Sequence, residues 1–310
     1  MKLEKDQLNR LYWKLELSMP SIAKELGVPK SNVEYWMKKF GIPRRPLLRY
    51  PRAKFSGDSK EKAYMLGLRY GDLYAARYKK GIVISTTTTH PAMAELFWST
   101  FRGYGRIYMH PFFNRVNNGH QWVLRVVVHD SFSFILDKPS KPPNWALSKD
   151  NFLHFVAGFF DAEGSIVITT RIRHGRWRVI ETSLTISNTR KNLLRMIGAR
   201  LRDYHPVLEL NRRKGPDTSA YGGMRRRSQW TLIVRRRIAV EHLLEEWKIR
   251  HPEKIMKSNI ALAALRGCSY ASVKSSVKAL RLRIAREVEA FAALAVVLSK
   301  IDHEIASIES

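Results

Sequence analysis

The sequence predicts an α+β fold in which a small N-terminal helical module precedes a tandem αββαββα repeat and a C-terminal helical extension. Three observations predict it. Short helical periodicities separated by glycine occupy residues 1–43. Residues 61–261 pass twice through the order helix, strand pair, helix, strand pair, helix. From residue 262 to 310 the pattern is helical again, with apolar residues three or four positions apart from residue 277.

The N-terminal module is expected to form three helices, at residues 6–15, 20–26 and 29–40. The two later helices have a proline in their first turn, where its missing N–H costs nothing, and Gly27 supplies the turn between them. The expected core consists of Ile22, Leu26, Val28, Val33, Trp36 and Phe40. The arrangement resembles a helix-turn-helix, whose second helix enters the major groove of DNA. Its outward residues would be Lys30, Ser31, Asn32, Tyr35 and Lys39. A three-helix bundle without DNA contact is the alternative.

The repeat follows a basic, proline-containing linker at residues 44–60. Its first copy is expected at 61–137 and its second at 151–261. A Lys- and Pro-rich linker at 138–150 divides the two copies, because its prolines fit neither a helix interior nor a strand interior. The expected strands are 73–78, 82–87, 106–113, 121–129, 165–173, 177–187, 207–213 and 228–235.

Several of these strands alternate between apolar and polar residues. In the strand at 121–129, one face carries Trp122, Leu124, Val126 and Val128, and the other carries Gln121, Arg125 and His129. The strand at 177–187 alternates in the same way. Each sheet should therefore have one apolar face and one polar face whose side chains can reach nucleic-acid bases.

The charge of the chain points to a polyanionic partner. Lys and Arg number 55 against 27 Asp and Glu, which gives a net charge of +28. Such an excess neutralises phosphates and favours nucleic acid, with a ribosome-associated protein or a membrane-surface protein as rival interpretations. The single cysteine, Cys268, excludes an internal disulfide. We expect no leader at the start of the chain, and the longest apolar run, 290–298, is too short to span a bilayer. We expect a cytoplasmic, nucleoid-associated protein with no membrane partner.

The helical extension at 262–310 carries a long apolar stripe between Val277 and Ile308. Packing of this stripe on the rest of the chain is the favoured interpretation, because the intramolecular route loses no translational freedom. A coiled coil that dimerises the protein or binds a partner is the alternative. We therefore expect a monomer.

Two aligned segments carry the candidate chemistry. Residues 65–72 (Met-Leu-Gly-Leu-Arg-Tyr-Gly-Asp) match residues 156–163 (Val-Ala-Gly-Phe-Phe-Asp-Ala-Glu) at an offset of 91 residues. The second copy closely resembles the LAGLIDADG motif of homing endonucleases. The first is looser, since Tyr70 stands where the motif has its first aspartate and Leu73 replaces the terminal glycine. The resemblance extends over roughly residues 61–260. It includes the Thr-Thr-Thr-His-Pro stretch at 87–91 and the His-Pro-Glu-Lys stretch at 251–254.

The motif has a physical logic of its own. Gly67 and Gly158 leave helix faces without side chains, so that two motif helices can pack backbone to backbone. Each helix then ends in an acid, Asp72 or Glu163, and two carboxylates that meet would repel unless divalent cations bind between them. Mg²⁺ (or Mn²⁺) suits such oxygen ligands. Asp161, two residues before Glu163, points elsewhere, and we expect it to cap the helix or to form a hydrogen bond inside the interface.

The resemblance implies further site residues. The carbonyl oxygens of Gly71 and Ala162 are implied as additional metal ligands, and Lys254 as the residue that stabilises the developing negative charge, with Lys138 as its weaker counterpart in the first copy. For both lysines a solvated linker position is the alternative. The basic residues expected on DNA are Arg77, Lys79, Arg125, Arg171, Arg173, Arg176, Arg178, Arg212, Arg213, Lys214, Arg225, Arg226 and Arg227.

The first functional hypothesis is a site-specific, Mg²⁺-dependent endonuclease that cuts double-stranded DNA as a monomer. The second is a catalytically silent, sequence-specific DNA-binding regulator on the same scaffold. The third is an intron maturase, for which the partner would be structured RNA. The two acids distinguish the first hypothesis from the second, because both are present in this chain.

Overall fold

The computed structural model describes residues 3–15, 17–44, 52–78, 81–115, 118–211 and 229–308, with the side chains of 211 and 300–308 excepted. It divides the chain into two compact units, Met1–Tyr50 and Pro51–Ser310. The second unit holds two antiparallel four-stranded sheets and most of the helices, so the predicted α+β class is confirmed.

The first unit is helical and has a small core of its own. It consists of α1 (Lys5–Asn9), a π-helical segment (Arg10–Lys14), α2 (Met19–Glu25) and α3 (Lys30–Lys39). Gly27, with φ of +62°, forms the turn between α2 and α3 in a conformation that favours glycine. Of the expected core residues, Ile22, Val28 and Val33 are buried, whereas Leu26, Trp36 and Phe40 are only partly buried. Met37, the neighbour of Trp36, is buried in this core although the sequence analysis did not place it there.

The two sheets of the second unit have the same topology. The first contains β1 (Tyr74–Arg77), β2 (Ile82–Thr88), β3 (Ile107–Asn114) and β4 (Gly119–Val128) in the order β1-β2-β4-β3. The second contains β5 (Gly164–Arg173), β6 (Trp177–Asn188), β7 (Val207–Asn211) and β8 (Gln229–Val234) in the order β5-β6-β8-β7. Over the described residues, the ends of these strands lie within two residues of the predicted ones. The repeated order of elements in the sequence therefore corresponds to two sheets with the same strand order.

The helices differ between the two copies. The first contains α4 (Ser59–Tyr70) and α5 (Pro91–Phe101) and ends in a 3₁₀ turn, η2 (Asp130–Ile135). A second 3₁₀ turn, η3 (Asn144–Leu147), precedes the second copy. That copy contains α6 (Lys149–Glu163), α7 (Lys191–Arg200), η4 (Arg202–Tyr204), α8 (Arg237–Glu246) and α9 (Pro252–Leu265). The helix expected at the end of the first copy is thus a short 3₁₀ helix of six residues, because the prolines that follow it restrict the chain.

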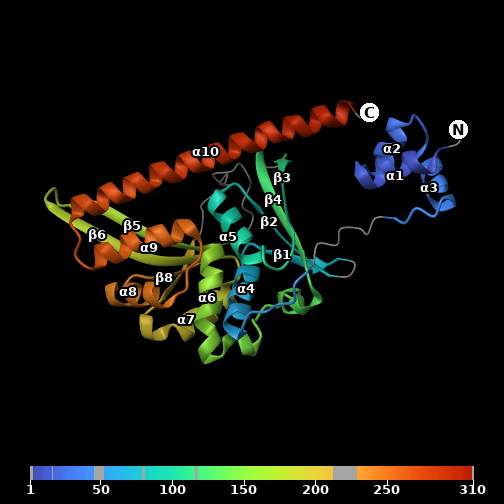
Figure 1. The fold of residues 1–310 in the computed structure, drawn as a ribbon. Helices are drawn as coiled ribbons and strands as arrows, with labels where there is room; N and C mark the ends of the chain where they lie inside the picture. Colours follow the sequence, from blue (N-terminus) through green and yellow to red (C-terminus); the bar gives the residue numbers. More distant parts are fainter. Residues whose placement is uncertain are drawn as a thin grey trace. The chain divides into compact units, whose positions relative to one another are not determined.

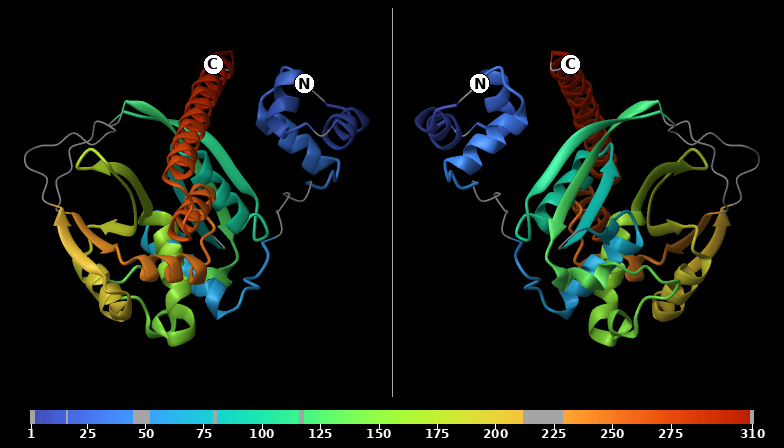
Figure 2. Two further views of the ribbon diagram at one scale, coloured as in Figure 1. Left: turned by 90° about the vertical axis from the view of Figure 1, so that its left-hand side faces the viewer. Right: turned by 90° about the vertical axis from the view of Figure 1, so that its right-hand side faces the viewer.

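The extension forms one long helix, α10 (Tyr270–Ile308), which contacts strands of both sheets. Figure 1 shows it running from the side of β5 and β6 to the side of β3 and β4, and the views of Figure 2 show the same helix nearly end-on. The ring of Phe291 stacks on Trp122 at a centroid distance of 5.1 Å, and the Trp122 indole N–H donates to the Phe291 carbonyl at 2.9 Å. Part of the apolar stripe therefore packs within the chain, on the apolar face of the first sheet. Among the described helices, none has the length and apolarity of a membrane span.

Candidate active site

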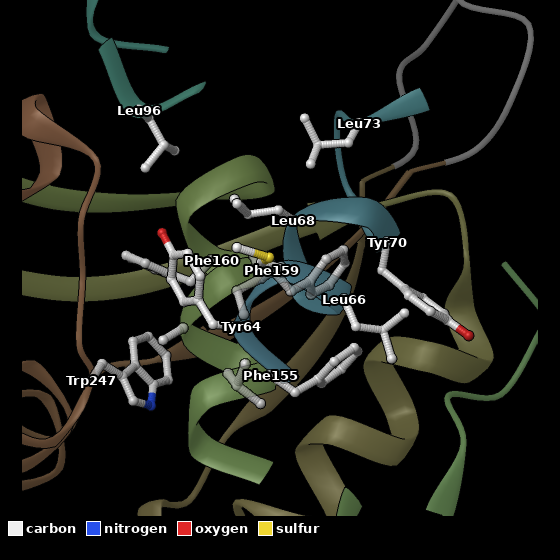
Figure 3. Packing of buried hydrophobic residues seen from close by; sticks show 14 of the residues in the cluster. Tyr64, Leu66, Leu68, Tyr70, Leu73, Leu96, Phe155, Phe159, Phe160 and Trp247 are labelled. Atoms are coloured by element: carbon white, nitrogen blue, oxygen red, sulfur yellow. The ribbon is translucent and has the colours of Figure 1, made fainter. Parts of the chain in front are cut away.

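The site begins with the contact between α4 and α6, which lie side by side in Figure 1. A Cβ atom on Gly67 would stand 2.1 Å from the Phe155 carbonyl oxygen, and one on Gly158 would stand 2.0 Å from the Tyr64 carbonyl oxygen. Neither position has room for a side chain. Around the contact, Leu66, Leu68, Phe155 and Phe159 form part of the buried core (Figure 3). The two glycines thus let the helix backbones touch.

This close contact continues to the carboxyl ends of the helices. A Cβ atom on Gly71 would meet the Ala162 side chain at 2.2 Å and Cγ of Glu163 at 3.1 Å. The residues that follow the two helices therefore lie together. Asp72 is exposed as a residue and Glu163 is half-buried, but the surrounding protein removes much of the water around both carboxyl groups.

The electrostatics of the two acids reflect their proximity. Removal of water by the surrounding protein and the charge of Asp72 raise the pKa of Glu163 to about 7, against the lowering effect of Lys138. The pKa of Asp72 is also raised, mainly because of the same loss of water. The Asn188 side chain donates a hydrogen bond to Glu163 Oε1 at 2.9 Å and orients it. Without a further cation, ionisation of both Asp72 and Glu163 costs free energy, because the second negative charge is repelled by the first.

Both expected lysines reach this place. Lys138 Nζ donates to the Gly71 carbonyl at 3.0 Å, and Lys254 Nζ donates to the carbonyls of Phe160 and Asp161 at 2.6 and 2.5 Å. Burial lowers the pKa of Lys254 to about 8; burial and the charge of Arg190 lower that of Lys138 to about 8. Lys254 is 8% exposed, so its interpretation as a solvated linker lysine is wrong for its position in the structure. Two cations therefore flank two acids.

The donor set fits a hard divalent cation. Two carboxylates from different helices converge, and their shared charge favours a cation between them. No cluster of three or more His, Cys, Asp or Glu side chains occurs among the described residues, so further ligands would be carbonyl oxygens and water. Of the two expected carbonyls, that of Gly71 already accepts a hydrogen bond from Lys138. A metal ion at Gly71 would share this oxygen with the ammonium group or displace it.

Asp161 lies inside the helix interface and is fully buried. Its Oδ2 accepts hydrogen bonds from the Tyr64 hydroxyl at 2.6 Å and from the Arg250 backbone N–H at 2.7 Å. This geometry agrees with the expected hydrogen-bonding role. The sequence did not single out Tyr64, Arg250 or Asn188. Tyr64 stands directly before the first motif copy and Arg250 directly before the His-Pro-Glu-Lys stretch, which could have pointed to them, whereas Asn188 ends β6 and no such signal marks it.

The polar face of the first sheet carries Arg125 and a row of residues that spans all four strands. Arg125 is paired with Ser85 of β2 and Tyr108 of β3, and Ser85 with Tyr74 of β1, so these side chains share one face. Tyr74 and Tyr108 are exposed, and the Arg125 guanidinium lies 4.8 Å from the Tyr78 ring centre. The sequence analysis missed these exposed aromatic residues. The alternation of Tyr108, His110 and Phe112 along β3 could have indicated them.

The other expected DNA-binding residues occupy several places. Arg171 and Arg173 lie on the polar face of the second sheet and pair with Glu181, whereas the register puts Arg178 on the opposite face and Arg176 in the hairpin turn. Arg77 forms an ion pair with Asp130. On α3, Lys30, Ser31, Tyr35 and Lys39 are exposed and Asn32 is half-exposed. The remaining candidates lie outside the described residues: Lys79, Arg212, Arg213, Lys214, Arg225, Arg226 and Arg227.

No family model and no curated protein matches this chain. Among solved structures, the meganuclease I-SmaMI bound to uncleavable DNA is 11% identical, with a TM-score of 0.46, over 74% of this chain and 100% of that one. The homing endonuclease I-WcaI bound to its DNA recognition sequence is 14% identical, with a TM-score of 0.45, over 65% and 86%. The LAGLIDADG homing endonuclease I-GzeII in complex with its DNA target is 12% identical, with a TM-score of 0.41, over 70% and 96%. I-GzeII bears the name of the family that the motif copies resemble.

Proposed function

We propose that this chain is a LAGLIDADG homing endonuclease that cuts both strands of a specific double-stranded DNA site in a reaction that requires a divalent metal ion. The observation that carries the proposal is the meeting of Asp72 and Glu163 at the ends of two helices, with Lys138 and Lys254 beside them. One acid and one lysine from each copy supply one cleavage centre per strand.

The chemistry is hydrolysis of a phosphodiester. A water oxygen forms a bond to phosphorus, the bond from phosphorus to one sugar oxygen breaks, and that oxygen takes up a proton. A bound Mg²⁺ would supply positive charge and an activated water at this place. Asp72 and Glu163, with the Ala162 carbonyl, would hold it, and Asn188 orients the Glu163 carboxylate.

The lysines supply charge that is fixed in place before the substrate arrives. Both ammonium groups donate to carbonyls at the ends of the motif helices, next to the acids. A charge held in this way stabilises the negative charge that develops on the phosphate, without rearrangement during the reaction. A pKa of about 8 for each lysine also permits it to hold or release a proton near neutral pH.

Binding is proposed to involve the polar faces of both sheets, with Arg125, Arg171 and Arg173 on the phosphates and the exposed tyrosines beside them. The net charge of +28 supports this partner. The α2–α3 pair is proposed as an additional DNA reader. The regulator hypothesis is less well supported, because a silent scaffold has no need for two acids that the protein shields from water, one of which raises the pKa of the other, beside two buried or half-buried lysines.

The test is a search for cleavage in genomic or random-library duplex DNA. The full chain is incubated with Mg²⁺, with Mn²⁺ and with a chelator, and new ends are sequenced; the Asp72→Asn/Glu163→Gln double variant is the control. We expect paired ends at one recurrent sequence that need both the metal and the acids. Enrichment of a bound sequence without new ends would support the regulator, and ends produced equally by the double variant would refute the nuclease.

A further inference from the structure

The two lysine-bearing segments are both anchored to the motif helices at equivalent positions. We call residues 135–139 the first lysine segment and residues 247–254 the second lysine segment. Tyr70 and Asp161 stand at the same place in the two motif copies, two residues before the acids and 91 residues apart. Each makes a hydrogen bond to the backbone of the lysine segment of its own copy.

In the first copy, the Tyr70 hydroxyl donates to the Pro139 carbonyl at 2.9 Å, immediately after Lys138. On the other side of Lys138, the neighbouring Arg69 donates to the carbonyls of Ile135 at 3.0 Å and Leu136 at 3.5 Å. The Tyr70 ring is buried and packs edge-on against Phe155 at 5.4 Å, so the hydroxyl is held firmly. The first lysine segment is therefore fixed on both sides of Lys138.

In the second copy, Asp161 accepts the backbone N–H of Arg250 at 2.7 Å and the Tyr64 hydroxyl at 2.6 Å. The Arg250 guanidinium binds both carboxylate oxygens of Glu61, at 2.8 and 2.5 Å, and lies 3.9 Å from the centre of the Tyr64 ring. Lys254 follows in the first turn of α9. This network ties the second lysine segment to both motif helices. Figure 3 shows the hydroxyls of Tyr64 and Tyr70 pointing to opposite sides of the packed helices.

The chemistry of the two anchors explains why they differ. Pro139 has no N–H and offers only a carbonyl, which a tyrosine hydroxyl can bind and an ionised aspartate cannot. Arg250 offers an N–H, which aspartate accepts. Tyr70, which departs from the motif, thus performs the same task with the hydrogen-bond direction reversed.

We propose that Tyr70 and Asp161 are equivalent positioning residues, and that each fixes the lysine of its own copy and so controls cleavage of one DNA strand. The ammonium group of a lysine sits at the end of a long flexible side chain, so its position depends on how well its backbone is fixed. The part of this proposal that concerns strand cleavage rests on the proposed function. The anchoring of the lysine segments does not depend on it.

The first test measures the cleavage rate of each strand separately on the DNA site, with either strand labelled. Lys138→Met and Lys254→Met first show which strand depends on which lysine. We expect Tyr70→Phe to slow the Lys138-dependent strand about 3- to 10-fold relative to the other, the scale of one lost hydrogen bond. Asp161→Asn should slow the Lys254-dependent strand. Tyr104→Phe is the matched control, because its ring packs on Phe55 and Phe132 rather than on a motif helix.

If Tyr70 and Asp161 had a purely structural role, their substitution would slow cleavage of both strands equally, and that result overturns the proposal. The proposal also fails if Tyr70→Phe slows the Lys254-dependent strand and Asp161→Asn slows the Lys138-dependent strand. Because Asp161 is buried, Asp161→Asn could unfold the chain. Glu61→Gln then serves as the second variant, since it weakens the ion pair with the Arg250 guanidinium and leaves the buried Asp161 in place.

The second test needs no cleavage. Hydrogen exchange followed by mass spectrometry should show faster amide exchange in the first lysine segment of Tyr70→Phe, with the second lysine segment unchanged. Asp161→Asn or Glu61→Gln should show the reverse. Unchanged exchange at the expected segment refutes the anchoring. If the wild-type protein cuts no DNA, the proposed function fails, and the exchange result still decides whether the two residues hold the lysine segments.

Discussion

Gly67 and Gly158 set the distance between the two acids, because only glycine lets the motif helices approach so closely. A Cβ atom on Gly67 would stand 2.1 Å from a backbone oxygen, which cannot move away as a flexible side chain can. We expect Gly67→Ala to lower the free energy of unfolding by about 3 kcal/mol or more. Gly103→Ala is the control, because a Cβ atom there meets open space, and it should change stability by less than about 0.5 kcal/mol. Urea denaturation measures both. Similar values would show that the helices can separate freely.

The raised pKa of Glu163 makes stability depend on pH. Its carboxyl has a pKa of about 7 in the folded protein against an ordinary value of 4.5, so the folded state holds a proton that the unfolded state loses. Through Glu163, the stability of the metal-free protein should therefore fall as pH rises from 4.5 to about 7. The raised pKa of Asp72 acts in the same direction, and the lysine shifts act only above pH 8. The pKa of His251, lowered by burial to about 3, adds stability as pH rises to 6.5, so the Glu163 contribution is the difference between the wild type and Glu163→Gln.

Urea midpoints at several pH values, measured with a chelator present, check this expectation. Glu163→Gln carries no titrating group at this position, so its stability should decline less over the same range. Mg²⁺ should bind more tightly as pH rises, since it displaces the shared proton. Parallel pH profiles for the wild type and Glu163→Gln would contradict the assignment.

At the residue scale, the motif copies marked the two acids, and the family resemblance implied both lysines; the structure places the lysines beside the ends of the motif helices. It did not predict the residues that hold them. Asn188 and Arg250 come from segments far along the chain, and only the fold brings Asn188 to Glu163 and Arg250 to Asp161. The sequence showed Tyr70 only as a departure from the motif. Its hydroxyl binds the carbonyl of Pro139, and no sequence pattern connects these two positions.

At the scale of elements, part of the apolar stripe of α10 packs on the chain itself. This packing favours the intramolecular interpretation over the coiled-coil alternative. Phe291 stacks on Trp122, while Leu294 on the same helix is 49% exposed. We expect Phe291→Ala to destabilise the protein by about 2 kcal/mol, less than a fully buried phenylalanine would. Leu294→Ala is the control and should have little effect. Urea unfolding followed by tryptophan fluorescence measures both. Equal effects would mean that the helix does not pack on the sheet through Phe291.

The strands were predictable because one face of each sheet is buried, and alternation follows directly from that burial. The last helix of the first copy was predicted poorly. Residues 130–136 are apolar enough for a helix, but the prolines that follow restrict the chain to the short turn η2. The core of the first unit was predicted in part, since periodicity cannot choose between Trp36 and its neighbour Met37 at the edge of an apolar face.

At the scale of the whole molecule, the first unit should be separable from the second. Each has its own core, and Phe55 packs on Tyr104 and Phe132 of the second unit. A chain that starts at Arg52 should therefore fold. It should protect a shorter stretch of DNA, with a shallower dependence of log K on log salt, because phosphate contacts are lost. Footprinting and salt titration measure this. An unchanged footprint and slope would remove α2 and α3 from the DNA interface.

The central claim is that one carboxylate from each motif copy carries the cleavage of double-stranded DNA. The most direct measurement compares Asp72→Asn and Glu163→Gln, each alone, with the wild type for double-strand cleavage and for binding of the same DNA. We predict that either change lowers double-strand cleavage on the order of 100-fold or more while binding stays within about threefold, because the phosphate contacts lie elsewhere on the sheets. Full double-strand cleavage by both single variants would show that the acids are structural and would contradict the account.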